Sequence, residues 1–231
     1  MNKRPLVLWS GGFDSTCLVI DKLYDGDIDI MYVNLENNER MQRYEKLAIR
    51  KLKVLLNDAN LKGKIMHEYN FGYQTITVTK AIFAQPALWL QAASMCVDPS
   101  RHNEVNIAYV RADDAWHYKH EIKEVYKSLL ALTCQDDEVV PLKFPFEWNT
   151  KASLVDHIKD FVYYKQVMDL IHYCEVGSKE PCGECGSCKR HVQEIEIHQP
   201  GKMMAIDMSA EFAEFEADKA AEAAFKEAEH E

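Results

Sequence analysis

Short apolar segments alternate with longer amphipathic segments through most of the chain. Apolar runs of strand length predict buried strands at 6–9, 28–33, 65–69, 105–109 and 139–142. Between these runs apolar residues recur at helical spacing, which predicts helices at 39–57, 87–95, 117–132, 150–161 and 164–171. Strands that are separated by helices favour parallel pairing, with helices on both faces of the sheet. We therefore predict an α/β fold built on a doubly wound parallel sheet.

The first predicted strand ends in a glycine turn that leads into a helix. This segment reads Ser10-Gly11-Gly12-Phe13-Asp14-Ser15-Thr16, with Asp14 or Ser15 placed to cap the helix. Glycine lets the backbone approach a ligand closely, and a helix N-terminus favours negative charge. The segment therefore predicts an anion site at the carboxyl edge of the sheet, with extra donors from the three hydroxyls. It lacks the Gly-Lys-Ser/Thr ending of a Walker loop, and the alternative is an ordinary glycine turn.

Composition and charge narrow the class of protein. The chain has 231 residues, 47% of them hydrophobic and 28% charged, which indicates one globular α/β domain with a small appendage. It has no apolar stretch near the ~20 residues of a membrane helix and no signal-peptide pattern at its start, so we expect a cytoplasmic protein that does not contact membranes. The net charge is −10, of which residues 208–231 carry −6 and the remainder −4. This balance argues against direct nucleic-acid binding.

Four of the seven cysteines are crowded near the C-terminal end of the predicted domain. Their spacing is Cys174-x7-Cys182-x2-Cys185-x2-Cys188, with glycines in the intervening loops. Closely spaced thiols in a reducing compartment favour a metal, and four thiolates form a closed, structural zinc site. An iron–sulfur cluster and a redox pair are the alternatives, and His191 could replace one thiol. The other three cysteines are expected to be core residues.

These two motifs together resemble one enzyme family. Ser10–Ser15 is similar to the SGGxDS pyrophosphate loop (PP-loop) of the ATP pyrophosphatases. The cysteine segment Cys182-Gly-Glu-Cys-Gly-Ser-Cys188 resembles the knuckle of the 7-cyano-7-deazaguanine synthases (QueC) within that superfamily. Pro141-Leu142 and Thr150-Lys151-Ala152 resemble two further segments of the same family. The resemblance implies a PP-loop domain at 1–172 and a zinc knuckle with its following helix at 173–200. Residues 201–231 lie outside the resemblance, and their Ala- and Glu-rich composition predicts an acidic helical tail.

The resemblance also implies ligands and roles. ATP would contact the turn and the end of the second strand, at Ser10, Gly11, Gly12, Phe13, Asp14, Ser15, Thr16, Val33 and Asn34. The residues implied in catalysis are Ser10, Asp14, Ser15 and Lys151, with Asp14 as the expected Mg²⁺ ligand and Lys151 reaching the phosphates. The small-molecule partners would be a deazapurine carboxylate and ammonia. A homodimer is expected from the family alone.

The middle of the chain departs from the family pattern, so its substrate residues are inferred from their chemistry. Asp113 and Asp114 can accept hydrogen bonds from a guanine-like edge, Arg111 can hold a carboxylate, and Trp116 offers a stacking face. The alternative is a polar surface loop with one packed tryptophan.

The sequence thus predicts an ATP-dependent ligase that converts 7-carboxy-7-deazaguanine and ammonia to 7-cyano-7-deazaguanine through adenylated intermediates. A close variant stops at the amide. A second enzyme class is a tRNA thiolase of the same superfamily, although thiolases need a free catalytic cysteine. The non-enzyme alternative is a degenerate scaffold whose zinc knuckle binds other macromolecules.

Overall fold

The computed structural model describes residues 3–35, 39–73, 84–111, 113, 115–134 and 139–198. All five strands of its sheet run parallel, in the spatial order β3-β2-β1-β4-β5. The strands are β1 (Arg4–Leu8), β2 (Ile28–Leu35), β3 (Ile65–Tyr73), β4 (His102–Asn106) and β5 (Leu142–Lys143). The predicted α/β fold with a parallel sheet is confirmed. The order of the strands reverses direction between β1 and β4, which is where ligands bind in open sheets of this kind.

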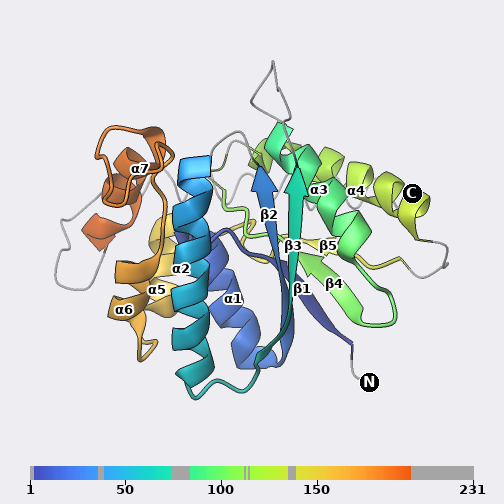
Figure 1. Ribbon diagram of the computed structural model, residues 1–231, viewed down its shortest axis with the longest axis horizontal. Coiled ribbons are helices and arrows are strands. Elements are labelled where there is room, and N and C mark those ends of the chain that lie inside the picture. Colours follow the sequence, from blue (N-terminus) through green and yellow to red (C-terminus); the bar gives the residue numbers. More distant parts are fainter. Residues whose placement is uncertain are drawn as a thin grey trace.

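Helices cover both faces of the sheet (Figure 1). The α-helices are α1 (Phe13–Asp25), α2 (Glu39–Asp58), α3 (Ala84–Cys96), α4 (Lys119–Thr133), α5 (Lys151–Ile158), α6 (Tyr164–Leu170) and α7 (Gly186–Glu194), with short 3-10 helices η2 (Trp116–Tyr118) and η3 (Glu196–His198). Figure 1 shows α1, α2, α5 and α6 on one side and α3 and α4 on the other. Within the described residues, no helix combines the length and the apolar character needed to cross a bilayer.

The alternation of side chains along β1 divides the core into two clusters. Val7 and Trp9 pack into the cluster beneath α1, α2, α5 and α6, whereas Leu6 and Leu8 pack into the cluster beneath α3 and α4. Successive strand side chains point to opposite faces, so a fully apolar run is what a strand covered on both faces requires. Each buried aliphatic side chain contributes roughly 1.5–3 kcal/mol relative to an exposed one. The central strand is thereby fixed between two helical layers.

Several boundaries differ from the expected ones. The fourth strand spans His102–Asn106 rather than 105–109, because the polar residues at its start pair with neighbouring strands while 107–110 continue without a ladder. The helix after the glycine turn begins at Phe13 with Gly12 as its N-cap, so neither Asp14 nor Ser15 caps it. The expected tail helix at 201–231 lies outside the described residues.

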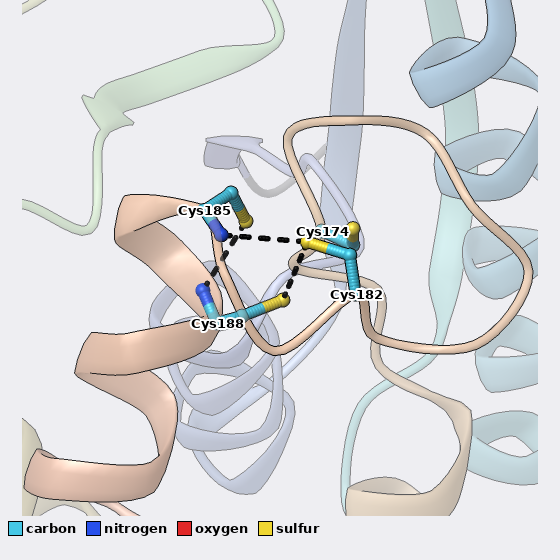
Figure 2. Close-up of side chains that lie close together, drawn as sticks. All are labelled: Cys174, Cys182, Cys185 and Cys188. Carbon is cyan, nitrogen blue, oxygen red and sulfur yellow. Dashed lines mark hydrogen bonds between the residues drawn. The ribbon is translucent and has the colours of Figure 1, made fainter.

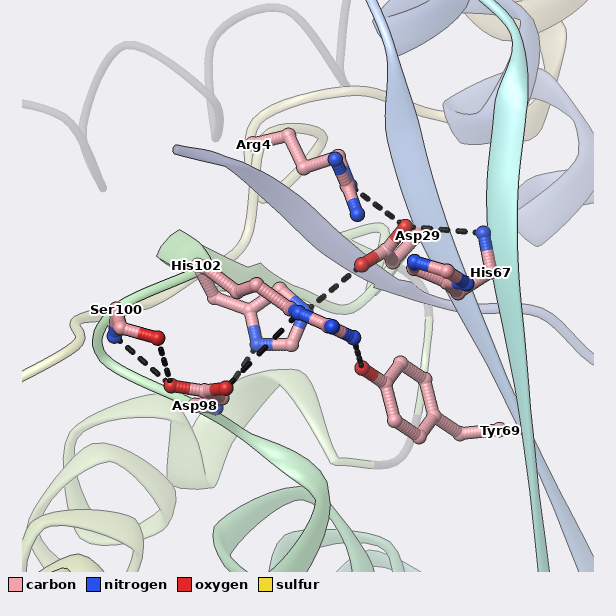
Figure 3. Close-up of polar contacts among 8 residues, drawn as sticks. Arg4, Asp29, His67, Tyr69, Asp98, Ser100 and His102 are labelled. Carbon is pink, nitrogen blue, oxygen red and sulfur yellow. Dashed lines mark hydrogen bonds and ion pairs between the residues drawn. The ribbon is translucent and has the colours of Figure 1, made fainter. Parts of the chain in front are cut away.

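A buried carboxylate on β2 contacts residues of β1, β3 and β4 at the end of the sheet opposite the glycine turn (Figure 3). Asp29, fully buried on β2, accepts hydrogen bonds from the Arg4 Nε at 2.7 Å and from the backbone N–H of His67 at 3.0 Å. Its second oxygen lies 3.1 Å from Nε2 of the fully buried His102. The Nδ1 atom of His102 accepts the backbone N–H of Asp98 at 2.9 Å. His102 is therefore neutral, with its proton on Nε2 donated to Asp29.

This arrangement predicts that acid destabilises the fold through His102. Burial lowers the pKa of His102 below its ordinary 6.5, although Asp29 and Asp98 act in the opposite direction and Arg4 adds to the lowering. Because the folded pKa is depressed, the unfolded state binds more protons below 6.5, so stability is lost as the pH falls through that value. Urea unfolding at about pH 7.5 and about pH 5.5 should show a smaller acid-induced loss for His102→Gln than for wild type.

A matched control is His67→Gln, because the side chain of His67 is exposed and only its backbone contacts Asp29. An equal acid-induced loss in wild type and His102→Gln would contradict the prediction. That result would assign the acid sensitivity to other groups.

Candidate functional site

The glycine turn joins β1 to α1 in a conformation that its sequence explains. Gly11 has φ of +77°, and a Cβ there would lie 3.1 Å from both the Glu45 carbonyl oxygen and Ile49 Cγ1 on α2. Any larger residue would thus meet both left-handed strain and a packed helix. The Ser10 and Ser15 hydroxyls are 3.0 Å apart across the turn, and no side chain caps the helix. The first amides of α1 are therefore available to an anion.

Two adjoining cavities flank this turn. The β2-side chamber, of about 350 Å³, is lined by Leu8, Trp9, Ser10, Tyr32, Val33, Met41, Gln42, Glu45, Gln85 and Trp89. The β4-side chamber, of about 270 Å³, is lined by Leu8, Ser10, Gly12, Phe13, Asp14, Ser15, Gln85, Pro86, Trp89, Ile107, Ala108, Tyr109, Asp113, Ala115 and Arg190. The two chambers share Ser10 and Trp89, so a ligand on the turn can extend into either. Together they have the size and mixed lining of a small-molecule site.

A charged group adjoins the β4-side chamber, whose lining includes its two carboxylates, Asp14 and Asp113. Lys151 Nζ donates to Asp14 Oδ2 at 2.9 Å and lies 4.0 Å from Asp113 Oδ1. Lys151 is the first residue of α5, whose N-cap Thr150 forms a reciprocal capping box with Ser153. That cap fixes the start of the helix and hence the direction of the lysine. Residues 137 positions apart in the chain are thereby brought together.

Burial and neighbouring charges shift the pKa values of Asp113 and Lys151. Burial raises the pKa of Asp113 to about 6, with a further increase from Asp14, against the opposing effects of Lys151 and a backbone hydrogen bond. Burial lowers the pKa of Lys151, but the two carboxylates outweigh it and the net shift is upward. Lys151 therefore stays protonated at neutral pH.

Asp14 also has an unused oxygen. Its Oδ1 is buried and has no hydrogen-bond partner within the described residues. Mg²⁺ in nucleotide enzymes is commonly held by one or two carboxylates together with substrate phosphates. An orphaned carboxylate oxygen beside an anion site fits that ion.

The other residues expected at the nucleotide site differ in whether they line a chamber. Val33 lines the β2-side chamber, whereas Asn34 does not, although its buried Oδ1 has no hydrogen-bond partner in the described part of the chain. Thr16 is fully buried, and its hydroxyl accepts the indole N–H of Trp9 at 3.0 Å. Its role is therefore structural: it holds the strand to the helix rather than facing either chamber.

The expected substrate residues also differ in whether they line a chamber. Asp113 lines the β4-side chamber, whereas Arg111 and Trp116 do not. Trp116 is buried, donates its indole N–H to the Glu147 carbonyl and has the Lys119 ammonium 4.7 Å from its ring centroid. Its faces are thus used inside the protein, which corrects the expectation of a ligand-stacking face. Asp114 lies outside the described residues.

Sequence reasoning missed most of the residues that line the chambers, among them Trp89, Glu45 and Arg190. Trp89 on α3 borders both, and its ring stacks on Tyr109 at a centroid distance of 6.3 Å. Glu45 borders the β2-side chamber, and Arg190 on α7 borders the β4-side chamber. The sequence offered two weak signals for these residues: Glu45 lies on an amphipathic helix, and Arg190 is a basic residue next to a cysteine motif. Neither specifies a cavity.

Glu45 is an unusual group for a cavity wall. The Tyr32 hydroxyl donates to Glu45 Oε2 at 2.7 Å, and the carboxyl is 9% exposed. Burial raises the pKa of Glu45 to about 7, although Tyr32 and Lys46 act in the opposite direction. The nearby Gln42 is also buried, and its Nε2 has no hydrogen-bond partner among the described residues. The chamber therefore holds polar groups that a ligand could satisfy.

The four clustered cysteines converge at one point beside α7 (Figure 2). The Sγ atoms of Cys174, Cys182, Cys185 and Cys188 lie within 4.8 Å of one another, and those of Cys182 and Cys188 are 3.9 Å apart. Tetrahedral zinc with Zn–S bonds of about 2.3 Å would separate its sulfurs by about 3.8 Å. The cluster can therefore hold a metal such as zinc.

Local hydrogen bonds prepare these thiols for a metal. The backbone N–H groups of Cys185 and Cys188 donate to the sulfurs of Cys182 and Cys185, each at 3.4 Å. Burial raises the pKa of Cys174, but the Ser178 hydroxyl and backbone amides outweigh this and lower it to about 5. Burial raises the pKa of Cys188 to about 12. A bound cation would remove this disparity, because it favours the thiolate at all four positions.

The segment that carries the cluster is attached directly to the glycine turn. The backbone N–H of His172 donates to the Gly11 carbonyl at 2.9 Å, two residues before the first cysteine. Gly177, with φ of +69°, packs so closely on α2 that a Cβ would lie 2.4 Å from the Met41 nitrogen. The cysteine cluster is thus positioned relative to both the turn and the β2-side chamber.

The comparisons with known proteins add no relative. No protein-family model matches the chain, and no curated protein matches it either. Function must therefore be argued from the site itself.

Proposed function

We propose that this protein is an ATP-dependent ligase of the 7-cyano-7-deazaguanine synthase type, with a PP-loop fold. The observation that carries the proposal is the meeting of Asp14, Lys151 and Asp113 beside the Ser10–Ser15 turn. An anion-binding helix start, an ammonium and an orphaned carboxylate oxygen are the parts that phosphate activation requires. The two motifs that resemble the family, the turn and the cysteine cluster, are joined through His172.

The two chambers suggest how the substrates divide. The triphosphate lies on the turn, with its nucleoside in the β2-side chamber near Gln42 and Glu45, and the acid enters the β4-side chamber beside Trp89 and Tyr109. The stacked pair of Trp89 and Tyr109 offers an apolar wall for a flat heterocycle. The reacting carboxylate and the α-phosphate then meet above Asp14.

The proposed chemistry balances as two adenylations. A carboxylate oxygen attacks the α-phosphorus of ATP, pyrophosphate leaves, and ammonia then displaces AMP from the acyl carbon with loss of a proton. In the second round the amide oxygen attacks the α-phosphorus of a second ATP and a second pyrophosphate leaves, and loss of AMP and of the nitrogen-bound protons then gives the nitrile. Lys151 and the first amides of α1 stabilise charge on the departing pyrophosphate. Mg²⁺ held by Asp14 would neutralise phosphate charge.

The experiment that tests the function is mass spectrometry of 7-carboxy-7-deazaguanine after incubation with the zinc-loaded protein, ATP, Mg²⁺ and ammonium. Nitrile together with AMP supports the full reaction. Amide alone assigns the variant that stops after one adenylation. Unchanged acid, in protein that binds ATP, rejects the deazapurine substrate and leaves an adenylating enzyme of another acid.

The placement of the nucleoside predicts an effect of Gln42. Gln42→Leu should weaken Mg·ATP binding by about 5- to 10-fold, because a bound nucleoside would otherwise satisfy its buried amide. Isothermal titration calorimetry measures this directly, with Gln166→Leu on the exposed face of α6 as the control. Unchanged affinity in Gln42→Leu would place the nucleoside elsewhere.

A further inference from the structure

Arg190 brings a positive charge from the cysteine segment into the β4-side chamber. It is the sole arginine or lysine among the described residues that line this chamber. It comes from α7, two residues after Cys188, whereas no other of these lining residues comes from the cysteine segment. A cationic side chain from a separate structural element therefore lines the same chamber as Asp14 and Asp113.

The guanidinium of Arg190 is incompletely satisfied. Its Nη2 lies 3.4 Å from the Ser187 hydroxyl and 3.6 Å from Glu175 Oε1, both long contacts on the same segment. Its Nε is buried and has no hydrogen-bond partner in the described part of the chain. The side chain is 40% exposed, so the remainder of the guanidinium is open to a ligand. A planar donor in this state suits a carboxylate, which it can hold with two parallel hydrogen bonds.

The charges of the neighbouring groups indicate what Arg190 contributes to the chamber. Lys151 is already committed to two carboxylates, Asp14 and Asp113. Without Arg190 this group would carry one net negative charge when both acids are ionised, and an anionic ligand would be repelled. Arg190 adds a positive charge to the wall of the same chamber, although its 3.6 Å contact with Glu175 offsets part of that charge. The attraction between Arg190 and Asp113 also opposes the rise in the pKa of Asp113.

From this geometry we infer that Arg190 forms a carboxylate-binding subsite for the acid substrate in the β4-side chamber. The inference rests on the proposed function for the identity of that acid, but the subsite itself is defined by the chamber. Arg190 takes the role that sequence reasoning gave to Arg111. The ligand class is a flat aromatic or heteroaromatic carboxylate, with its ring near Trp89 and Tyr109 and its carboxylate on Arg190.

The cysteine cluster controls this subsite through α7. Cys185 is the N-cap of α7, and its sulfur accepts the N–H of Cys188. A metal bound to these two cysteines fixes the first turn of the helix, and Arg190 lies in the next turn. The cluster therefore positions a substrate-binding group in addition to stabilising the segment around it.

The test is titration of the zinc-loaded protein, followed by tryptophan fluorescence, because Trp89 borders the chamber. The probes are 7-carboxy-7-deazaguanine and indole-3-carboxylate, each compared with the same ring lacking its carboxylate. We expect Arg190→Gln to weaken binding of both carboxylates by about 10- to 100-fold and to leave the uncharged rings and Mg·ATP unaffected. The carboxylate affinity of Arg190→Lys should lie between those of wild type and Arg190→Gln, because lysine keeps the charge and loses the planar fork. Lys189→Gln, at an exposed position on the same helix, is the matched control.

The outcomes separate this inference from the proposed function. If binding of indole-3-carboxylate depends on Arg190 but 7-carboxy-7-deazaguanine is neither bound nor converted, the subsite is supported and the proposed substrate is wrong. Equal carboxylate affinity in wild type and Arg190→Gln overturns the subsite, as does failure of wild type to bind any of the carboxylates. Selective loss of Mg·ATP affinity would assign Arg190 to the phosphates and also overturn it.

Discussion

Lys151→Gln is expected to slow ATP-dependent formation of AMP by about 10²- to 10³-fold, the usual cost of removing one preorganised donor to a developing anion. Lys151 is 15% exposed, and its ammonium is held 2.9 Å from Asp14 at the edge of the anion site. The two carboxylates keep it protonated, so it supplies a fixed positive charge where pyrophosphate departs. The substitution keeps a polar side chain, one atom shorter than that of lysine, and removes the positive charge. Coupled pyrophosphate release measures the rate.

The control for this prediction is Lys159→Gln, because Lys159 follows the same helix, is exposed and pairs with Asp156 on the surface. It should react at the wild-type rate. A Lys151→Gln enzyme within threefold of wild type would contradict a catalytic role for the ion pair. Circular dichroism and thermal unfolding of each variant separate loss of chemistry from loss of fold.

The sequence predicted those parts of the site that are contiguous in the chain. The turn, the start of α5 and the cysteine spacing each combine a local backbone requirement with a reactive side chain, as at Gly11 and Lys151. Such segments carry their chemistry in a short pattern. The parallel sheet followed equally from the alternation of apolar runs, since β1 is buried on both faces.

The wall of the site could not be predicted, because its residues come from elements that meet only in the folded protein. Trp116 and Arg111 were inferred from their chemistry as a stacking face and a carboxylate partner, yet Trp116 packs on Lys119 inside the protein. Trp89, which borders both chambers and stacks on Tyr109, comes from α3 instead. Arg190 reaches the chamber only because the cysteine segment folds back toward the turn.

Cys182→Ser is expected to have the largest effect on structure. Structural zinc sites in small domains contribute about 10–16 kcal/mol of binding free energy that is also folding free energy. The segment from Cys174 to η3 contributes few residues to the core clusters, so its order depends on the cluster rather than on apolar packing. Replacing one thiolate by a poorly ligating hydroxyl should reduce zinc after gel filtration from one equivalent to well below one. Hydrogen exchange across 174–195 should accelerate strongly, while β1 and β2 remain protected.

The matched control is Cys134→Ser, since this half-buried cysteine lies at the end of α4, outside the cluster. It should keep a full equivalent of zinc and wild-type exchange. Because Cys185 and Cys188 set the start of α7, the Cys182→Ser protein should also lose affinity for aromatic carboxylates to the same extent as Arg190→Gln. Its affinity for Mg·ATP should fall less, because the phosphates are held by the turn itself. Retention of one zinc with unchanged exchange would show that the four thiols are not a metal centre, and the position of Arg190 would then depend on packing alone.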